Sequence, residues 1–263
     1  MLFEIESVGG TLARRLARRR ESVAGFPWDE LAREAGAAGA YDARVVWTES
    51  AFSEYASAGA FAQIASSLLA LGAPIEMSAA AADFVLDELL HAELSSRVAM
   101  ALGGAVPLLV DLERLVRPPA AESSLVRVAE LLVRTCCVGE TLTVAVLLAA
   151  REQVKPGVLK DVMARLVRDE AEHAELGWTF LDWADERLSA ADRAYLGSVA
   201  GHAVSSFAPL LARSCNEGGS LGVMPCNAFD AAFASAVTSK VVVPLRSRGI
   251  LAEEIERLAS EAS

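Results

Sequence analysis

The feature that most constrains the fold is a pair of Glu-x-x-His motifs, Glu88-Leu-Leu-His91 and Glu170-Ala-Glu-His173. The same 82 residues separate the two glutamates and the two histidines, in a chain with only three histidines. Residues three apart project from the same side of an α-helix, so each motif directs one carboxylate and one imidazole toward a common point. We therefore expect a repeated helix pair, with one further inward carboxylate on the helix before each motif.

Hydrophobic patterning around these motifs predicts an all-α fold. Aromatic residues make up only 6% of the chain, and the alanine-rich composition disfavours sheets. The expected bundle helices cover 42–71, 78–103, 124–154 and 158–187, with breaks at Gly72-Ala-Pro74 and Pro156-Gly157. Shorter helices are expected before and after them, although Thr238–Val243 fits a strand equally well.

Glu140 is the candidate carboxylate on the third helix. The surrounding segment, Thr135–Val146, is otherwise almost wholly apolar. An unpaired carboxylate in such surroundings is costly, which favours a role as a ligand.

On the first helix the candidates are Glu49 and Glu54. Residues at equal depth in an antiparallel hairpin are equidistant from the turn, and Glu140 and Glu170 are centred beside Pro156-Gly157. Glu54 and Glu88 are likewise centred beside Gly72, whereas Glu49 would move the centre into the helix. We therefore predict Glu54.

Asp87 and Asp169 each precede a motif glutamate and lie four residues before a motif histidine. A histidine that binds a metal normally donates its other ring N–H to such an acceptor. We expect both aspartates to accept hydrogen bonds from the imidazoles, on the same helix or across the bundle.

Two Glu-x-x-His motifs with two further glutamates form the dimetal-carboxylate pattern of ferritin-like bundles. Over residues 42–187 the chain resembles the ferritin-like diiron-carboxylate superfamily, although Leu90 and Glu172 replace an arginine found in several members. The resemblance implies a long crossover between helices two and three, here Ala105–Ser123. It also implies two iron ions, or manganese or a mixed pair, on Glu54, Glu88, His91, Glu140, Glu170 and His173, with two of the glutamates bridging. We expect these two to be Glu88 and Glu170.

The resemblance further implies an oxidase or oxygenase that activates dioxygen with an electron donor and oxidises a small, largely apolar organic substrate. Ser95 stands where a radical-generating reductase subunit usually has tyrosine, and Leu166 where arylamine oxygenases have an additional histidine. The alternative is a non-catalytic or ferroxidase-type iron-binding protein. An oxygenase predicts an apolar cavity bordering Glu54 and Glu140, with the lining Ala58, Phe61, Cys136, Cys137 and Val144.

Three parts are expected: an N-terminal extension (1–41), the dimetal bundle (42–188) and C-terminal helices (189–263) that act as a lid or form a homodimer. The net charge of −11 opposes nucleic-acid binding. The acidic N-terminus predicts a cytoplasmic protein, and the uncharged stretches 55–75 and 194–212 are interpreted as buried helices, not membrane spans. All four cysteines are expected to be reduced thiols. Cys136 and Cys137 are expected to pack in the core, as is a hydrogen-bonded His202.

Overall fold

The computed structural model describes the whole chain except residues 7, 20–22, 24, 35–39, 218 and 253–263. The described part is all-α, as predicted. Its α-helices are α1 (Gly10–Arg19), α3 (Trp28–Glu34), α4 (Ala40–Leu71), α5 (Ile75–Ala101), α6 (Ser124–Leu132), α7 (Thr141–Gln153), α8 (Val158–Ala184), α9 (Ala190–Leu211), α10 (Cys226–Ala236) and α11 (Val243–Ser247). Two π-helices, η2 (Val133–Glu140) and η5 (Val237–Val242), continue α6 and α10, and three 3-10 turns connect other elements: η1 (Leu112–Arg114), η3 (Asp185–Arg187) and η4 (Ala212–Ser214). The strands β1 (Cys215–Asn216) and β2 (Met224–Pro225) have two residues each and pair in parallel.

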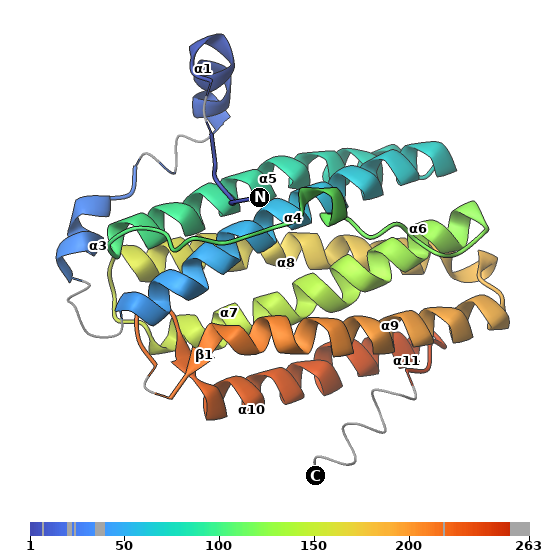
Figure 1. Ribbon diagram of the computed structural model, residues 1–263. Coiled ribbons are helices and arrows are strands. Elements are labelled where there is room, and N and C mark those ends of the chain that lie inside the picture. The colour runs from blue at the N-terminus through green and yellow to red at the C-terminus, as the bar shows by residue number, and fades with distance from the viewer. Residues whose placement is uncertain (7, 20–22, 24, 35–39, 218, 253–263) are drawn as a thin grey trace.

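Two helical hairpins make up the centre of the molecule (Figure 1). Helices α4 and α5 are joined at Gly72, whose positive φ of 68° a residue with a side chain rarely adopts. The continuous segment α6–η2–α7 is joined to α8 at Pro156-Gly157. Both turns lie where the sequence predicts them, although α5 begins directly after Pro74, three residues earlier than expected.

Helices α5 and α7 run in the same direction although they follow one another in sequence, because residues 102–123 return along the length of the hairpins (Figure 1). At its start this crossover is attached to α4, where the Thr48 hydroxyl accepts a hydrogen bond from the Val106 amide at 3.1 Å. At its end the carboxylate of Glu130 accepts hydrogen bonds from the amides of Ala120 and Ala121 at 2.9 Å. The predicted crossover is therefore a fixed part of the structure.

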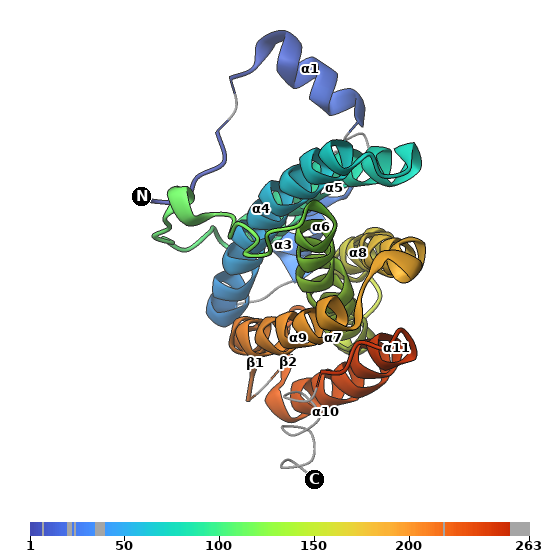
Figure 2. The same ribbon diagram turned by 90° about the vertical axis from the view of Figure 1, so that its right-hand side faces the viewer.

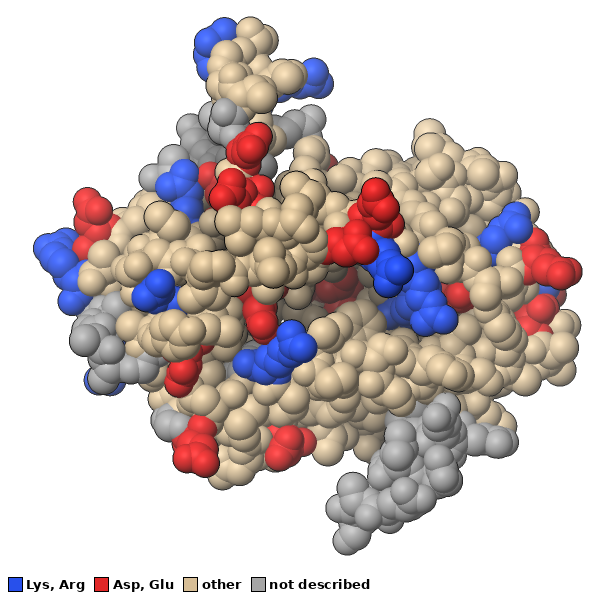
Figure 3. All heavy atoms as spheres, in the orientation of Figure 1, with Lys and Arg blue, Asp and Glu red and all other residues tan. Residues whose placement is uncertain are grey.

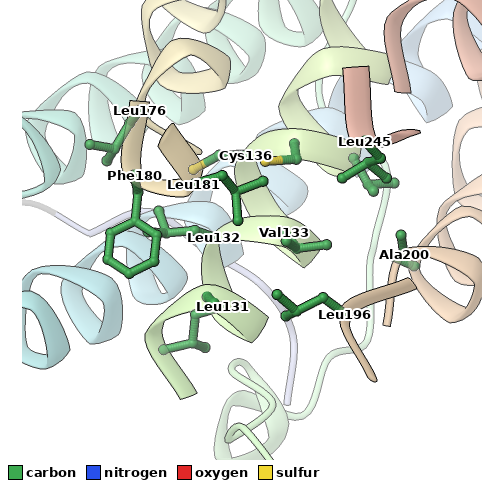
Figure 4. Close-up of a cluster of buried hydrophobic side chains, with 14 of the residues drawn as sticks. Leu131, Leu132, Val133, Cys136, Leu176, Phe180, Leu181, Leu196, Ala200 and Leu245 are labelled. Carbon is green, nitrogen blue, oxygen red and sulfur yellow. The ribbon is translucent and has the colours of Figure 1, made fainter. Parts of the chain in front are cut away.

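The C-terminal helices extend the core (Figure 4). Side chains from α6, η2, α8, α9 and α11 point toward one another there: Leu131, Leu132, Val133, Cys136, Leu176, Phe180, Leu181, Leu196, Ala200 and Leu245. Cys136 and Cys137 are both fully buried, which confirms them as core residues. Helix α9 thus lies against η2, and α10 lies against α7, as Figure 2 shows from the end of the molecule. The division of the chain into three parts stays a prediction.

The third bundle helix differs from expectation because its middle is a π-helix that ends at Glu140. The side chain of Thr141 donates a hydrogen bond to the carbonyl of Cys136 at 3.1 Å. Gly177 of α8 lies against this segment so closely that a Cβ there would be 2.7 Å from Cys137 Sγ. Single-turn π-helices are rare and frequently occur at functional sites.

Two further expectations need correction. Thr238–Val243 is helical and not a strand, since it belongs to η5 and the start of α11. Cys215 and Cys226 form a disulfide, with their Cα atoms 4.9 Å apart, because the pairing of β1 with β2 folds the intervening loop back on itself. Disulfides are uncommon in cytosolic proteins, so the cysteines do not support the cytoplasmic prediction.

Two helical segments, Ser124–Gln153 and Cys226–Ser247, are long and apolar enough to cross a membrane by length and composition alone. The first has 67% of its most apolar window buried, as expected for a core helix. They are weak evidence for a membrane protein, and the structure is compatible with a soluble one. Figure 3 shows charged groups of both signs distributed over one face, with few over the middle of α9.

Candidate metal centre

The two Glu-x-x-His motifs meet in the interior of the molecule. Helix α5 supplies Glu88 and His91, and α8 supplies Glu170 and His173. All four side chains are fully buried, and one ligand atom from each lies within 4.8 Å of the others. Two distant parts of the sequence therefore form one polar group in an apolar core.

Both imidazoles direct Nδ1 toward the glutamates. His91 Nδ1 lies 3.0 Å from Glu170 Oε1 and 3.8 Å from Glu88 Oε2. His173 Nδ1 lies 3.0 Å from Glu170 Oε2 and 3.1 Å from Glu88 Oε1. Glu88 and Glu170 thus each lie between the two histidines, with one oxygen toward each imidazole.

The aspartates that precede the motif glutamates lie near the other ring nitrogen, Nε2, of each imidazole, and they do so across the bundle. His91 Nε2 is 3.3 Å from Asp169 Oδ2, and His173 Nε2 is 3.6 Å from Asp87 Oδ2. Each aspartate therefore faces the histidine of the other motif and not the one four residues further along its own helix. Arg165, one turn earlier on α8, also donates to Asp169.

Glu54 and Glu140 lie beside this group. Glu54 Oε2 is 3.9 Å from His91 Nδ1, and 13% of the Glu54 side chain is exposed. Glu140 is buried at the end of η2. Glu49, the rejected alternative, points away from the cluster and forms an ion pair with Arg213 at 3.5 Å.

The buried charges shift the pKa values of the histidines and of Glu170. Burial by itself would lower the pKa of His91, but the charge of Glu170 and a hydrogen bond with Asp169 raise it. Burial would also lower the pKa of His173, but the nearby carboxylates of Asp87 and Glu170 raise it to about 12. Burial would raise the pKa of Glu170, whereas the charge of His91 and the hydrogen bond with His173 lower it.

Glu54 and Glu140 shift in the opposite direction. Burial raises the pKa of both well above the usual range, and the negative charges of Glu170 and Glu88 raise it further. These shifts favour the neutral form of both glutamates, which reduces the buried negative charge.

Several polar atoms of the cluster lack a hydrogen-bond partner among the described residues. They are Glu88 Oε1 and Oε2, His91 Nδ1, Glu170 Oε1 and His173 Nε2. Buried polar groups in native proteins are normally satisfied, so these atoms indicate a missing partner. Glu88, His91, Glu170 and His173 could hold a metal ion.

Two aromatic rings, those of Phe61 and Phe84, pack against His173, and the sequence did not single out Phe84 for this position. The Phe84 ring centroid lies 4.3 Å from that of His173, and the Phe61 centroid lies 5.1 Å from it. Phe84 is one turn before Glu88, on the same face of α5, and this spacing is the signal that could have identified it.

The structure confirms Glu54 as a boundary of the predicted cavity but does not confirm the predicted lining. Phe61, Cys136 and Cys137 are fully buried core residues. A cavity of about 50 Å³ instead borders Glu54 on the other side, and it is lined by Val46, Trp47, Ser50, Ser95, Val146, Leu147, Ala150, Met163, Leu166 and Gly222. Of the other predicted lining residues, Ala58 is buried and Val144 is half-buried, and neither borders this cavity.

The remaining polar residues that the sequence singles out agree with expectation only in part. Glu172 and Glu175 are exposed, as predicted, and Glu93 is half-buried and pairs with Arg97 at 3.0 Å. His202 is not a core residue: it lies on the exposed face of α9 and is 2.8 Å from the Ser198 carbonyl.

Comparison of the chain with models of protein families, with curated proteins and with solved structures gives no match. The function must therefore be argued from the site itself.

Proposed function

We propose that this chain is a ferritin-like dimetal-carboxylate protein in which α4, α5, α6–α7 and α8 form the four-helix bundle. The observation that carries the proposal is the fully buried group Glu88, His91, Glu170 and His173. The parallel course of α5 and α7, joined by the crossover, supports the same topology (Figure 1).

The donor set fits two hard divalent ions. Four carboxylates offset about four positive charges, and an oxygen-rich set with two imidazoles suits iron or manganese better than zinc, whose structural sites favour sulfur. Glu54, Glu88 and His91 would hold one ion, and Glu140, Glu170 and His173 the other. Glu88 and Glu170 are the bridging candidates because each has one oxygen near each imidazole.

The surrounding residues prepare the site for redox chemistry. Bound iron or manganese would supply electrons for the activation of dioxygen, drawn from an external donor. Asp169 would accept the Nε2 proton of His91, and the negative charge of Asp87 faces His173 Nε2 from 3.6 Å, so that each Nδ1 stays directed toward the glutamates. Phe61 and Phe84 exclude water from the His173 side. We infer an oxidase or oxygenase that acts on a small, largely apolar organic substrate.

A specific observation favours a second candidate, a non-catalytic or ferroxidase-type iron-binding protein. The interior space expected for a substrate beside Cys136 and Cys137 is filled by core side chains. An iron-binding protein needs no such space.

Metal analysis of the purified protein, produced with ample iron and manganese, tests the shared part of the two proposals. About two ions per chain are expected, and Glu170→Ala or His173→Ala should remove at least one. Full metal content in both variants would refute the site, and zinc alone would argue against redox chemistry.

Oxygen uptake and peroxide consumption in the presence of a reductant distinguish the two candidates. An oxidase continues to consume dioxygen as long as reductant is supplied. A binding protein stops once its iron is oxidised.

A further inference from the structure

A groove of about 480 Å³ lies between the first half of α5 and the last half of α8. Figure 2 shows these two helix segments from the end of the molecule. Buried or half-buried apolar side chains line its floor: Met77, Ala80, Phe84 and Leu176. Exposed Glu76, Glu172 and Glu175 stand around it, with Ala171 and Thr179. The volume is within the usual range for small-molecule sites.

The groove is one aromatic ring away from the candidate metal centre. Phe84 lines the groove and contacts His173, with 4.3 Å between ring centroids. Asp87, one turn further along α5, is 3.6 Å from His173 Nε2 and is partly exposed. A molecule in the groove therefore lies next to the layer that shields the metal ligands.

The charge around the groove is uncompensated. The sequence has no lysine or arginine between residues 75 and 96 or between residues 169 and 186. None of the three groove glutamates has an ion pair or hydrogen bond within the described ranges of the chain. Apolar walls with unpaired carboxylates at the opening are complementary to a molecule with a hydrocarbon body and a cationic end.

We propose that the groove binds a small organic cation, an aliphatic ammonium compound with an apolar body, and that this is the substrate class of the adjacent metal centre. The assignment of the substrate rests on the proposed oxidase function. Binding in the groove does not, because its determinants lie outside the metal ligands.

Calorimetry on the metal-free protein tests the groove with three probes of one shape: 4-phenylbutylamine, 4-phenylbutan-1-ol and 4-phenylbutanoate. We expect the amine to bind most tightly and the carboxylate least. The double variant Glu172→Gln/Glu175→Gln should weaken amine binding by about 5- to 10-fold, as expected for the loss of two exposed ion pairs. Ala171→Phe should fill the groove and abolish binding of all three. Glu186→Gln, an exposed glutamate on η3, is the matched control and should change nothing.

Equal binding of the three probes, or binding that survives both groove variants, would overturn the proposal. So would a failure of the amine to bind combined with slower Mn²⁺ uptake by the double variant, which would make the groove a route for metal ions.

A second measurement separates this proposal from the proposed function. In protein loaded with Mn²⁺, the paramagnetic ion should accelerate relaxation of the NMR signals of the bound amine. Amine binding without metal uptake would retain the groove and refute the metal centre. Metal uptake without amine binding would retain the metal centre and refute the proposal for the groove.

Discussion

Glu140→Gln distinguishes a metal ligand from a buried structural glutamate. The pKa of Glu140 is raised by burial and by the charges of Glu170 and Glu88, so we expect its carboxyl group to be protonated in the metal-free protein. Glutamine has the same shape as a protonated glutamate and also donates a hydrogen bond. The variant should therefore leave the stability of the metal-free protein within about 1 kcal/mol of the original while it removes an anionic ligand.

The magnitude follows from linkage. Metal at 100 times its Kd stabilises the native state by about 2.7 kcal/mol, which raises Tm by about 5–10 °C for a chain of this size. Residues that merely orient a ligand cost up to about 100-fold in metal affinity, and loss of the ligand itself should cost at least as much. At the same metal concentration the variant would then gain only about 0.4 kcal/mol, or about 1 °C.

Thermal unfolding monitored by circular dichroism measures the Tm of the metal-free protein and the rise in Tm on addition of Mn²⁺. Glu186→Gln serves as the control. An undiminished metal-dependent rise in Tm would show that Glu140 is not a ligand. A large fall in the Tm of the metal-free variant would show that the carboxyl is ionised there, which would refute the protonation argument.

Three further outcomes are expected. Asp169→Asn should weaken metal binding by about 10–100-fold without removing a direct ligand, as measured by competition with a chelator.

Glu130→Gln should destabilise the protein by about 2 kcal/mol at neutral pH, because it loses the charge-assisted hydrogen bonds from Tyr195 and two backbone amides. Burial would raise the pKa of Glu130, but the hydrogen bonds from Tyr195 and from those amides lower it. The stabilisation by Glu130 is therefore present above its pKa in the unfolded chain and is lost as the pH falls through its lower pKa in the folded protein. Urea titrations across that pH range should show the stability of the variant and that of the original protein converge. Unfolded protein should show two free thiols before reduction and four after it, and Cys215→Ser/Cys226→Ser should cost about 3 kcal/mol by the loop-entropy estimate.

The sequence by itself determined the local structure and the ligand candidates. Gly72 and Pro156 end helices because of their own backbone chemistry, whatever surrounds them. The i,i+3 spacing then fixes Glu88 and His91 on one face of α5, and equal distances from the turn select Glu54 over Glu49. These features depend on helix geometry alone, and the positions of the side chains agree with them.

Only the tertiary structure decided features that depend on how two helices are placed against each other. Asp87 and Asp169 face the histidines across the bundle because the rotation of α5 against α8, and not spacing along one helix, brings their carboxylates near the imidazoles. Spacing along the chain likewise gives no sign that Cys215 and Cys226 meet, since the β1–β2 pairing creates that contact.

The open space near the site was also decided by packing. Cys136 and Cys137 are small, and their position on the third helix predicts a cavity beside them. The π-helix η2 instead brings them against Gly177, while the groove opens on the far side of Phe84. The volume left between helices is a small difference between large packed volumes, so it depends on every side chain that contributes to them and cannot be obtained from the pattern of a single helix.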